Sequence, residues 1–207
     1  MKTLNQVESE KLLKNQNLCR NILTKNFNET SKWNSFPCVI KIMSDKFLHK
    51  TEINGVKMVH SKFEFEKSYS DLIKIIKMKK IKNAKILVQE FVEGDELIIG
   101  LKNDPTFGHV VLLGSGGILT ELIQDVSIRK CPVDKDEVLR MIDELKFKKI
   151  LYGYRNKKKA NIDSIVDAVV KISQLPKKYP KINELDINPF IVNSKEGKVC
   201  DARIVVD

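Results

Sequence analysis

The segment from Cys38 to Lys57 reads CVIKIMSDKFLHKTEINGVK and carries a lysine and a histidine within one strand–connection–strand unit. It begins with an apolar run after Pro37, which is typical of a buried strand, and Lys41 lies inside that run. A buried ammonium group is unfavourable unless an anion meets it. His49 follows eight residues later, and an imidazole can serve as a nucleophile or a base near neutral pH. Because Asn54-Gly55 predicts a turn into a second strand, the unit could bring the two side chains close together.

A simpler interpretation of the same segment stays open at this point. Lys41 could extend from a sheet edge with its ammonium group in water, and His49 could be a solvated loop residue. The segment alone therefore predicts two strands and their connection, and the rest of the chain has to supply the function.

The composition is that of a folded chain without a membrane span. Hydrophobic residues make up 42% of the 207 residues, enough for one large domain or two small lobes. No apolar run of about 18 residues occurs, and the first residues lack the apolar core of a signal peptide. Four widely spaced cysteines match no metal motif, so we expect reduced thiols and a cytoplasmic protein.

The net charge of +10 fits an anionic ligand as well as it fits nucleic acid. The 37 basic residues are mostly lysines, and they are spread along the whole chain. Neither a basic helix interleaved with aromatic residues nor a stacking platform for single strands is visible. We therefore expect a small anionic ligand rather than a nucleic acid.

Hydrophobic periodicity predicts the helices and strands. Helices are expected at residues 7–17, 27–33, 65–79, 135–145 and 162–175, with Asp134 and Asn161 as N-caps of the last two and Pro176 closing the last. Beyond the first pair, strands are expected at residues 85–91, 96–102, 109–113 and 126–131 and in a final hairpin of residues 183–192 and 198–206. Because several strands meet as hairpins, we predict an α+β fold with mixed, largely antiparallel sheets and flanking helices.

The C-terminal hairpin places oxygen-bearing side chains on one sheet face. Apolar residues alternate there with Glu184, Asp186 and Asn188, and a period of two puts these three on the same side. If the turn is centred just after Ser194, Asn188 lies opposite Asp201. A hard cation such as Mg²⁺ suits this set, because it takes one or two carboxylates and leaves room for phosphate oxygens. An exposed polar face is the alternative, and the hairpin alone does not decide between them.

Two weaker patterns lie at other strand ends. Gly116 and Gly117 could hold phosphate through their backbone N–H groups, although glycine clusters more often only form a turn. A strand ends at the acidic residue of the segment Glu90, Phe91 and Val92, and an adenine and a ribose could pack against this strand end. An ordinary strand end is the alternative there.

Four blocks of sequence together resemble the beta subunit, an ATP-grasp module, of the ADP-forming acetate–CoA ligases (NDP-forming acyl-CoA synthetases). The resemblance covers residues 7–204. The blocks are Lys41–Thr51; Val88–Glu90 with Glu96–Gly100; Asp104–Gly108 with Gly116–Ile118 and Asp125–Arg129; and Glu184–Pro189 with Asp201–Arg203. The resemblance implies an ATP-grasp fold, for which we expect an N-terminal lobe of residues 1–90 and a C-terminal lobe of residues 91–207.

In this family acyl-CoA and phosphate yield a free acid, and the phosphoryl group passes through phosphohistidine to ADP. The resemblance implies that His49 accepts the phosphoryl group and that Asp186 orients the histidine. It further implies that Lys41 holds nucleotide phosphates, that Glu90, Phe91 and Val92 border the adenine, that Glu96 lies near the ribose or metal, and that Asn188 and Asp201 bind Mg²⁺.

The resemblance also implies partners for the chain. We expect a separate CoA-binding alpha subunit, assembled with this chain into a heterotetramer, and ATP or ADP as substrate with Mg²⁺ as cofactor. The alternative function is a catalytically degenerate basic domain that binds nucleic acid or acts as an adaptor.

Overall fold

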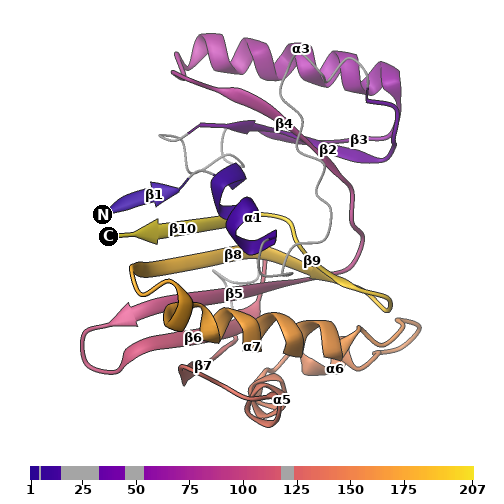
Figure 1. The fold of residues 1–207 in the computed structure, drawn as a ribbon. Coiled ribbons are helices and arrows are strands. Elements are labelled where there is room, and N and C mark those ends of the chain that lie inside the picture. Colours follow the sequence, from indigo (N-terminus) through magenta and orange to yellow (C-terminus); the bar gives the residue numbers. More distant parts are fainter. Residues whose placement is uncertain (5, 15–32, 45–53, 118–123) are drawn as a thin grey trace. The chain divides into compact units, whose positions relative to one another are not determined.

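The computed structural model describes residues 1–4, 6–14, 33–44, 54–117 and 124–207 (Figure 1). The chain divides into two compact units. Unit 1 comprises Met1–Arg20 and Glu93–Asp207, and unit 2 comprises Asn21–Val92. Each unit has its own sheet and its own hydrophobic core.

Unit 2 is a three-stranded antiparallel sheet with one long helix. The sheet order is β3–β2–β4, and its elements are β2 (Cys38–Met43), β3 (Val56–Val59), β4 (Lys85–Glu90) and helix α3 (Lys62–Met78). The helix begins three residues before the expected start because Ser61 caps it: the Ser61 hydroxyl accepts the Glu64 N–H at 3.2 Å. The Glu64 carboxylate in turn accepts the N–H of His60, the residue before the cap, at 2.8 Å.

The two faces of strand β2 have different environments. Ile40 and Ile42 belong to the core that also contains Phe65 and Leu72 of α3. Successive side chains of a strand alternate between faces, so Lys41 points to the side of the sheet away from α3. The prediction of a lysine inside a buried strand is confirmed, because Lys41 is only 5% exposed.

Unit 1 contains a seven-stranded sheet in the order β1–β10–β8–β5–β6–β7, with β9 paired to β8. Its strands are β1 (Lys2–Leu4), β5 (Asp95–Asp104), β6 (Gly108–Ser115), β7 (Val126–Lys130), β8 (Ile182–Val192), β9 (Gly197–Val199) and β10 (Ala202–Val206). Its helices are α1 (Gln6–Lys14), α5 (Lys135–Glu144), α6 (Lys148–Leu151) and α7 (Ile162–Lys178). Every pairing between described strands is antiparallel, as the α+β prediction requires.

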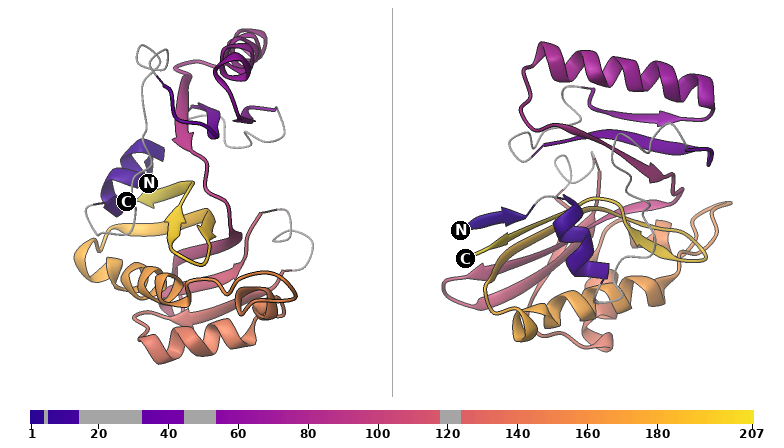
Figure 2. Two further views of the ribbon diagram at one scale, coloured as in Figure 1. Left: turned by 90° about the vertical axis from the view of Figure 1, so that its right-hand side faces the viewer. Right: turned by 45° about the horizontal axis from the view of Figure 1, so that its top comes forward.

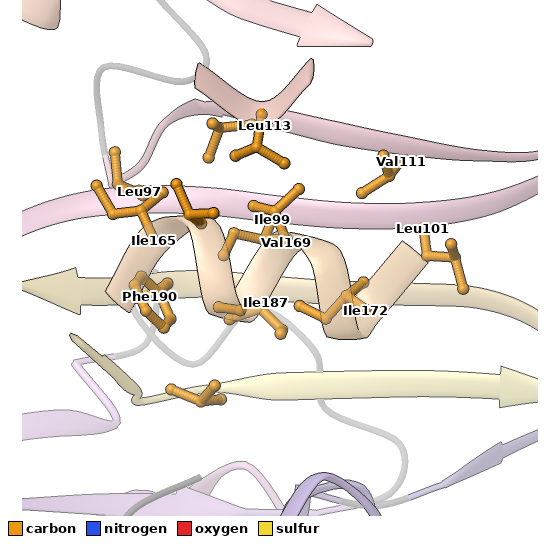
Figure 3. Close-up of a cluster of buried hydrophobic side chains, with 14 of the residues drawn as sticks. Leu97, Ile99, Leu101, Val111, Leu113, Ile165, Val169, Ile172, Ile187 and Phe190 are labelled. Carbon is orange, nitrogen blue, oxygen red and sulfur yellow. The ribbon is translucent and has the colours of Figure 1, made fainter. Parts of the chain in front are cut away.

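Helices α5 and α7 pack on the same face of this sheet (Figure 2). Ile165, Val169 and Ile172 of α7 point toward Ile99 and Ile187 of the central strands (Figure 3). Burial of each such side chain contributes about 1.5–3 kcal/mol, so this face is fixed as the core. The residues that alternate with Ile187 along β8 consequently point to the other face.

The predicted caps of α5 and α7 are confirmed. A carboxylate oxygen of Asp134 accepts the Glu137 N–H at 2.8 Å, and the amide oxygen of Asn161 accepts the Ser164 N–H at 3.0 Å. The expectation that Pro176 closes the last helix is wrong, since α7 continues to Lys178. A proline so near a helix end removes only one of the last backbone hydrogen bonds, which the packed turn tolerates. None of the described helices is both long and apolar enough to span a bilayer.

The expected domain division and one expected helix remain to be compared with the structure. The division into residues 1–90 and 91–207 differs from the two compact units at residues 91 and 92, which belong to unit 2, and in the first twenty residues. The first residues belong to unit 1 because β1 pairs with β10 and Leu13 lies in the core of that unit. The helix expected at residues 27–33 lies almost wholly outside the described residues.

Candidate functional site

The C-terminal strands have the register that the sequence predicts. Ala202 pairs with Ile187, and the Asn188 N–H donates to the Asp201 carbonyl oxygen at 3.2 Å. Asn188 therefore lies opposite Asp201, as expected. The turn between Val192 and Gly197 is centred just after Ser194, also as expected.

Carboxylates gather on the face of β8 that points away from the core helices. Burial, followed by the charges of Glu184 and Asp201, raises the pKa of Asp186, and Arg203 opposes this shift. Arg203 is the cross-strand partner of Asp186, and Lys102 is the cross-strand partner of Glu184, so two cations face three acids. Because this face carries excess negative charge, a bound cation would stabilise it.

A β-bulge sets the position of Asn188. The register between β5 and β8 shifts between Leu97 and Ile99, so that Asn188 and Pro189 together face the single residue Ile98. Bulges of this kind redirect a side chain. The Asn188 amide oxygen here accepts the backbone N–H of Gly117, with 3.2 Å between the two atoms.

Gly116 and Gly117 lie directly against Glu96. The Gly116 N–H donates to the Glu96 carbonyl oxygen at 2.8 Å. Gly117 has a φ of +64°, and a Cβ added to it would lie 2.1 Å from Glu96 Oε2. A side chain here would be strained by the positive φ and would displace the Glu96 carboxylate, so this strand end places a backbone N–H, a carboxylate and an amide oxygen close together.

The residues present fit a magnesium ion. The carbonyl oxygen of Asn188 has two lone pairs, and the hydrogen bond from Gly117 occupies one of them. Asp201 on the facing strand adds a carboxylate. Within the described ranges no group of three or more His, Cys, Asp or Glu side chains forms a closed metal cage. Mg²⁺ usually binds where the protein supplies only a few oxygen ligands, because water and phosphate oxygens occupy its other coordination positions.

Unit 2 contributes a different part of the predicted site. Lys41 lies on the same side of its sheet as its cross-strand partner Leu87. Glu90 ends β4 and is exposed, Phe91 donates its N–H to the Pro37 carbonyl oxygen at 3.4 Å, and Val92 is buried. This part therefore offers a buried cation and a strand end.

The predicted residues thus fall into three groups. Unit 2 contains Lys41, Glu90, Phe91 and Val92, and unit 1 contains Glu96, Gly116, Gly117, Asp186, Asn188 and Asp201. His49 lies outside the described residues. Sequence reasoning missed the hydrogen bond between Gly117 and Asn188, because no local pattern joins residues so far apart in the chain.

A family model described as "ATP-grasp domain" matches residues 2–206, nearly the whole chain. The chain belongs to the ATP-grasp domain family. The predicted ATP-grasp fold is thereby confirmed.

Two curated relatives of this ATP-grasp chain are named as ADP-forming acetate–CoA ligases. Acetate–CoA ligase [ADP-forming] I of Archaeoglobus fulgidus is 36% identical over 174 residues, which are 83% of this chain and 25% of that protein. The beta subunit of acetate–CoA ligase [ADP-forming] I of Pyrococcus furiosus is 34% identical over 180 residues, which are 83% of this chain and 75% of that subunit. The chain thus spans about a quarter of the first relative and most of the second, and the predicted resemblance is confirmed.

Solved structures agree with the sequence comparison. The dinucleotide forming acetyl-coenzyme A synthetase 1 of Ca. Korarchaeum cryptofilum, in complex with coenzyme A and Ca-AMPCP, matches this ATP-grasp chain with a TM-score of 0.90 at 36% identity. The match covers 100% of this chain and 94% of that one. Another structure of the same protein, with a TM-score of 0.85, 35% identity and coverage of 100% and 93%, contains coenzyme A and Mg-AMPPCP and has its phosphohistidine segment pointing towards the nucleotide binding site.

Proposed function

We propose that this ATP-grasp chain is the nucleotide-binding part of an ADP-forming acyl-CoA ligase of the acetate–CoA ligase type. In this role it transfers a phosphoryl group between phosphohistidine and ADP with Mg²⁺. The observation that carries the proposal is the joined group of Glu96, Gly117, Asn188 and Asp201 on one end of the unit 1 sheet. A relative of the same fold contains a magnesium nucleotide analogue, which supports it.

Asn188 and Asp201 are the residues that would hold the metal. Bound Mg²⁺ supplies charge neutralisation for the nucleotide phosphates. The Gly117 N–H bonds to the Asn188 amide oxygen, and the remaining lone pair of this oxygen would be the one to hold the metal. Glu96 lies against Gly117 and would contact the ribose or the metal.

Lys41 and the end of β4 complete the proposed nucleotide site. Lys41 is only 5% exposed, so its ammonium group would meet phosphate oxygens in an environment with little water, where such contacts are strong. Glu90, Phe91 and Val92 form the segment proposed to border the adenine.

The proposed chemistry needs positioning more than covalent help from the protein. A β-phosphate oxygen of ADP attacks phosphorus, the N–P bond of a phosphohistidine breaks, and ATP and a free imidazole result. His49 is the proposed carrier, on the strength of the family resemblance, and Asp186 would orient its imidazole. Over the full cycle acyl-CoA, phosphate and ADP give the free acid, CoA and ATP.

A CoA-binding alpha subunit completes the proposed enzyme, in a heterotetramer. The relative named as a subunit beta supports this arrangement for the present chain. The alpha subunit would bind acyl-CoA and form the first phosphohistidine.

The test is a reconstitution of ATP formation. The chain is mixed with the CoA-binding alpha subunit, acetyl-CoA, phosphate, Mg²⁺ and ADP, and ATP is measured. In the same mixture without ADP, His49 should carry an acid-labile phosphate, and His49→Ala should lose both this label and ATP formation while still binding Mg-ADP. Full turnover by His49→Ala would show that the phosphoryl group takes another route.

A further inference from the structure

The carbonyl group of Glu93 is held by a side chain 100 positions later in the sequence. The amide nitrogen of Asn193 donates to this oxygen, with 3.0 Å between the two atoms. Glu93 is the first residue of unit 1 after the Glu90–Val92 segment of unit 2. The bond therefore fixes the chain at the point where the proposed adenine-facing segment ends.

Asn193 is itself firmly held, which makes it a suitable anchor. Its side-chain oxygen accepts the N–H groups of Lys195 at 2.9 Å and Glu196 at 3.1 Å. Its backbone N–H donates to the Glu196 carbonyl oxygen at 2.9 Å, and its carbonyl oxygen accepts the N–H of Asn161, the N-cap of α7, at 2.8 Å. With both amide atoms engaged, the side chain has one orientation, and its nitrogen is directed to Glu93.

The backbone next to this bond is packed tightly. A Cβ on Gly94 would lie 2.4 Å from the Val192 carbonyl oxygen, so the chain enters β5 in direct contact with β8. On the other side of the segment, within unit 2, the Phe91 N–H donates to the Pro37 carbonyl oxygen. The hydrogen bond of Phe91 thus lies within unit 2 and that of Glu93 within unit 1, and the two residues are two positions apart in the chain.

We propose that Asn193 is a positioning residue for nucleotide binding: through its hydrogen bond to the Glu93 carbonyl group it holds Glu90–Val92 in the conformation that meets the adenine. This inference rests on the proposed function. The inference gives the turn between β8 and β9, which contains Asn193, a role in nucleotide binding.

The substitution Asn193→Asp isolates this bond. The aspartate keeps an oxygen for the N–H groups of Lys195 and Glu196 and replaces the donor to Glu93 with an acceptor. Asn183→Asp is the matched control, since the Asn183 amide nitrogen donates to the Asp207 carboxylate at 2.6 Å and the charge change is identical. Hydrogen exchange of the backbone amides of residues 91–95 and Mg-ADP affinity by calorimetry are measured on all three proteins.

Asn193→Asp should speed exchange in residues 91–95 and raise the Kd for Mg-ADP about fivefold, the effect of one hydrogen bond. The Kd for magnesium pyrophosphate, which has no base, should change less than twofold, and Asn183→Asp should match the wild type throughout. The inference is overturned by unchanged Mg-ADP affinity, or by an equal loss for pyrophosphate, in Asn193→Asp. Failure of the wild-type chain itself to bind Mg-ADP would instead refute the proposed function.

Discussion

The side-chain oxygen of Asn188 and the backbone N–H of Gly117 form a hydrogen bond across 71 positions of sequence. The bond connects the glycine turn after β6 to the strand proposed to bind the metal, and with the bond from Gly116 to Glu96 it occupies both glycine N–H groups that the sequence suggested for phosphate. It leaves the Asn188 oxygen with one further lone pair and sets the direction of that lone pair. Metal binding should therefore respond to changes at this contact.

Replacing Gly117 with alanine tests the contact from the backbone side. The residue has a φ of +64°, so Gly117→Ala should lower the free energy of unfolding by about 1 kcal/mol. The new Cβ would also displace the Glu96 carboxylate, so Mg-ADP binding should weaken about tenfold. Gly108→Ala is the control, since Gly108 has a φ of +71° and nothing within 4 Å of the added Cβ. Equal nucleotide affinity in the two variants, measured by calorimetry, would contradict the assignment of Glu96 and Gly117.

Asp201→Asn tests the metal. The substitution keeps the shape of the side chain and removes its charge, so Mg-ADP binding at limiting Mg²⁺ should fall about tenfold, with recovery at high Mg²⁺. The unfolding midpoint in urea should change little. Asp163→Asn is the control, because Asp163 is an exposed residue of α7 that forms an ion pair with Lys135 of α5 at 3.6 Å. Unchanged affinity at limiting Mg²⁺ would remove Asp201 from the metal site.

The substitution Lys41→Met tests whether the buried ammonium group of Lys41 binds the nucleotide phosphates. The substitution keeps the apolar stem of the side chain, so the three-stranded sheet should remain folded. Mg-ADP affinity should fall about tenfold. Lys85→Met, on the exposed end of the neighbouring strand β4, is the control. A stabilised Lys41→Met protein with wild-type affinity would make Lys41 an ordinary strand residue.

The raised pKa of Asp186 predicts that the stability of the protein depends on pH. Because its pKa is raised in the folded protein, the folded state holds this proton more tightly than the unfolded state. The stabilisation it gives is complete below its ordinary pKa, near 4, and is lost as the pH rises through the folded value. In metal-free buffer Asp186→Asn should therefore be more stable than wild type at pH 7 and show no such gain at pH 3. The free energies of unfolding of the two proteins are measured in urea at both pH values. An equal difference between the proteins at pH 3 and pH 7 would show that the pKa of Asp186 is not raised.

Local patterns in the sequence predicted much of the fold. Alternation along β8 predicted which residues of the hairpin face the core, and the symmetric turn predicted that Asn188 faces Asp201. The N-caps Asp134 and Asn161 were predictable because a cap needs only residues within one helical turn.

Features that depend on distant parts of the chain were not predictable in this way. β1 pairs with β10 at the opposite end of the sequence, which moves the first residues into unit 1. The bulge at Asn188 and Pro189 arises from pairing with β5, and the bond from Asn193 to Glu93 joins two loops. Pro176 lies inside α7, where local propensity predicts the end of the helix.

The central claim is that this chain binds a nucleotide together with Mg²⁺. Calorimetric titration of the wild-type chain with ADP, in the presence of Mg²⁺ and again in the presence of a chelator, tests it most directly. We predict saturable binding at one site per chain with Mg²⁺, and binding at least tenfold weaker without it. No binding, or binding of equal strength in both conditions, would contradict the claim.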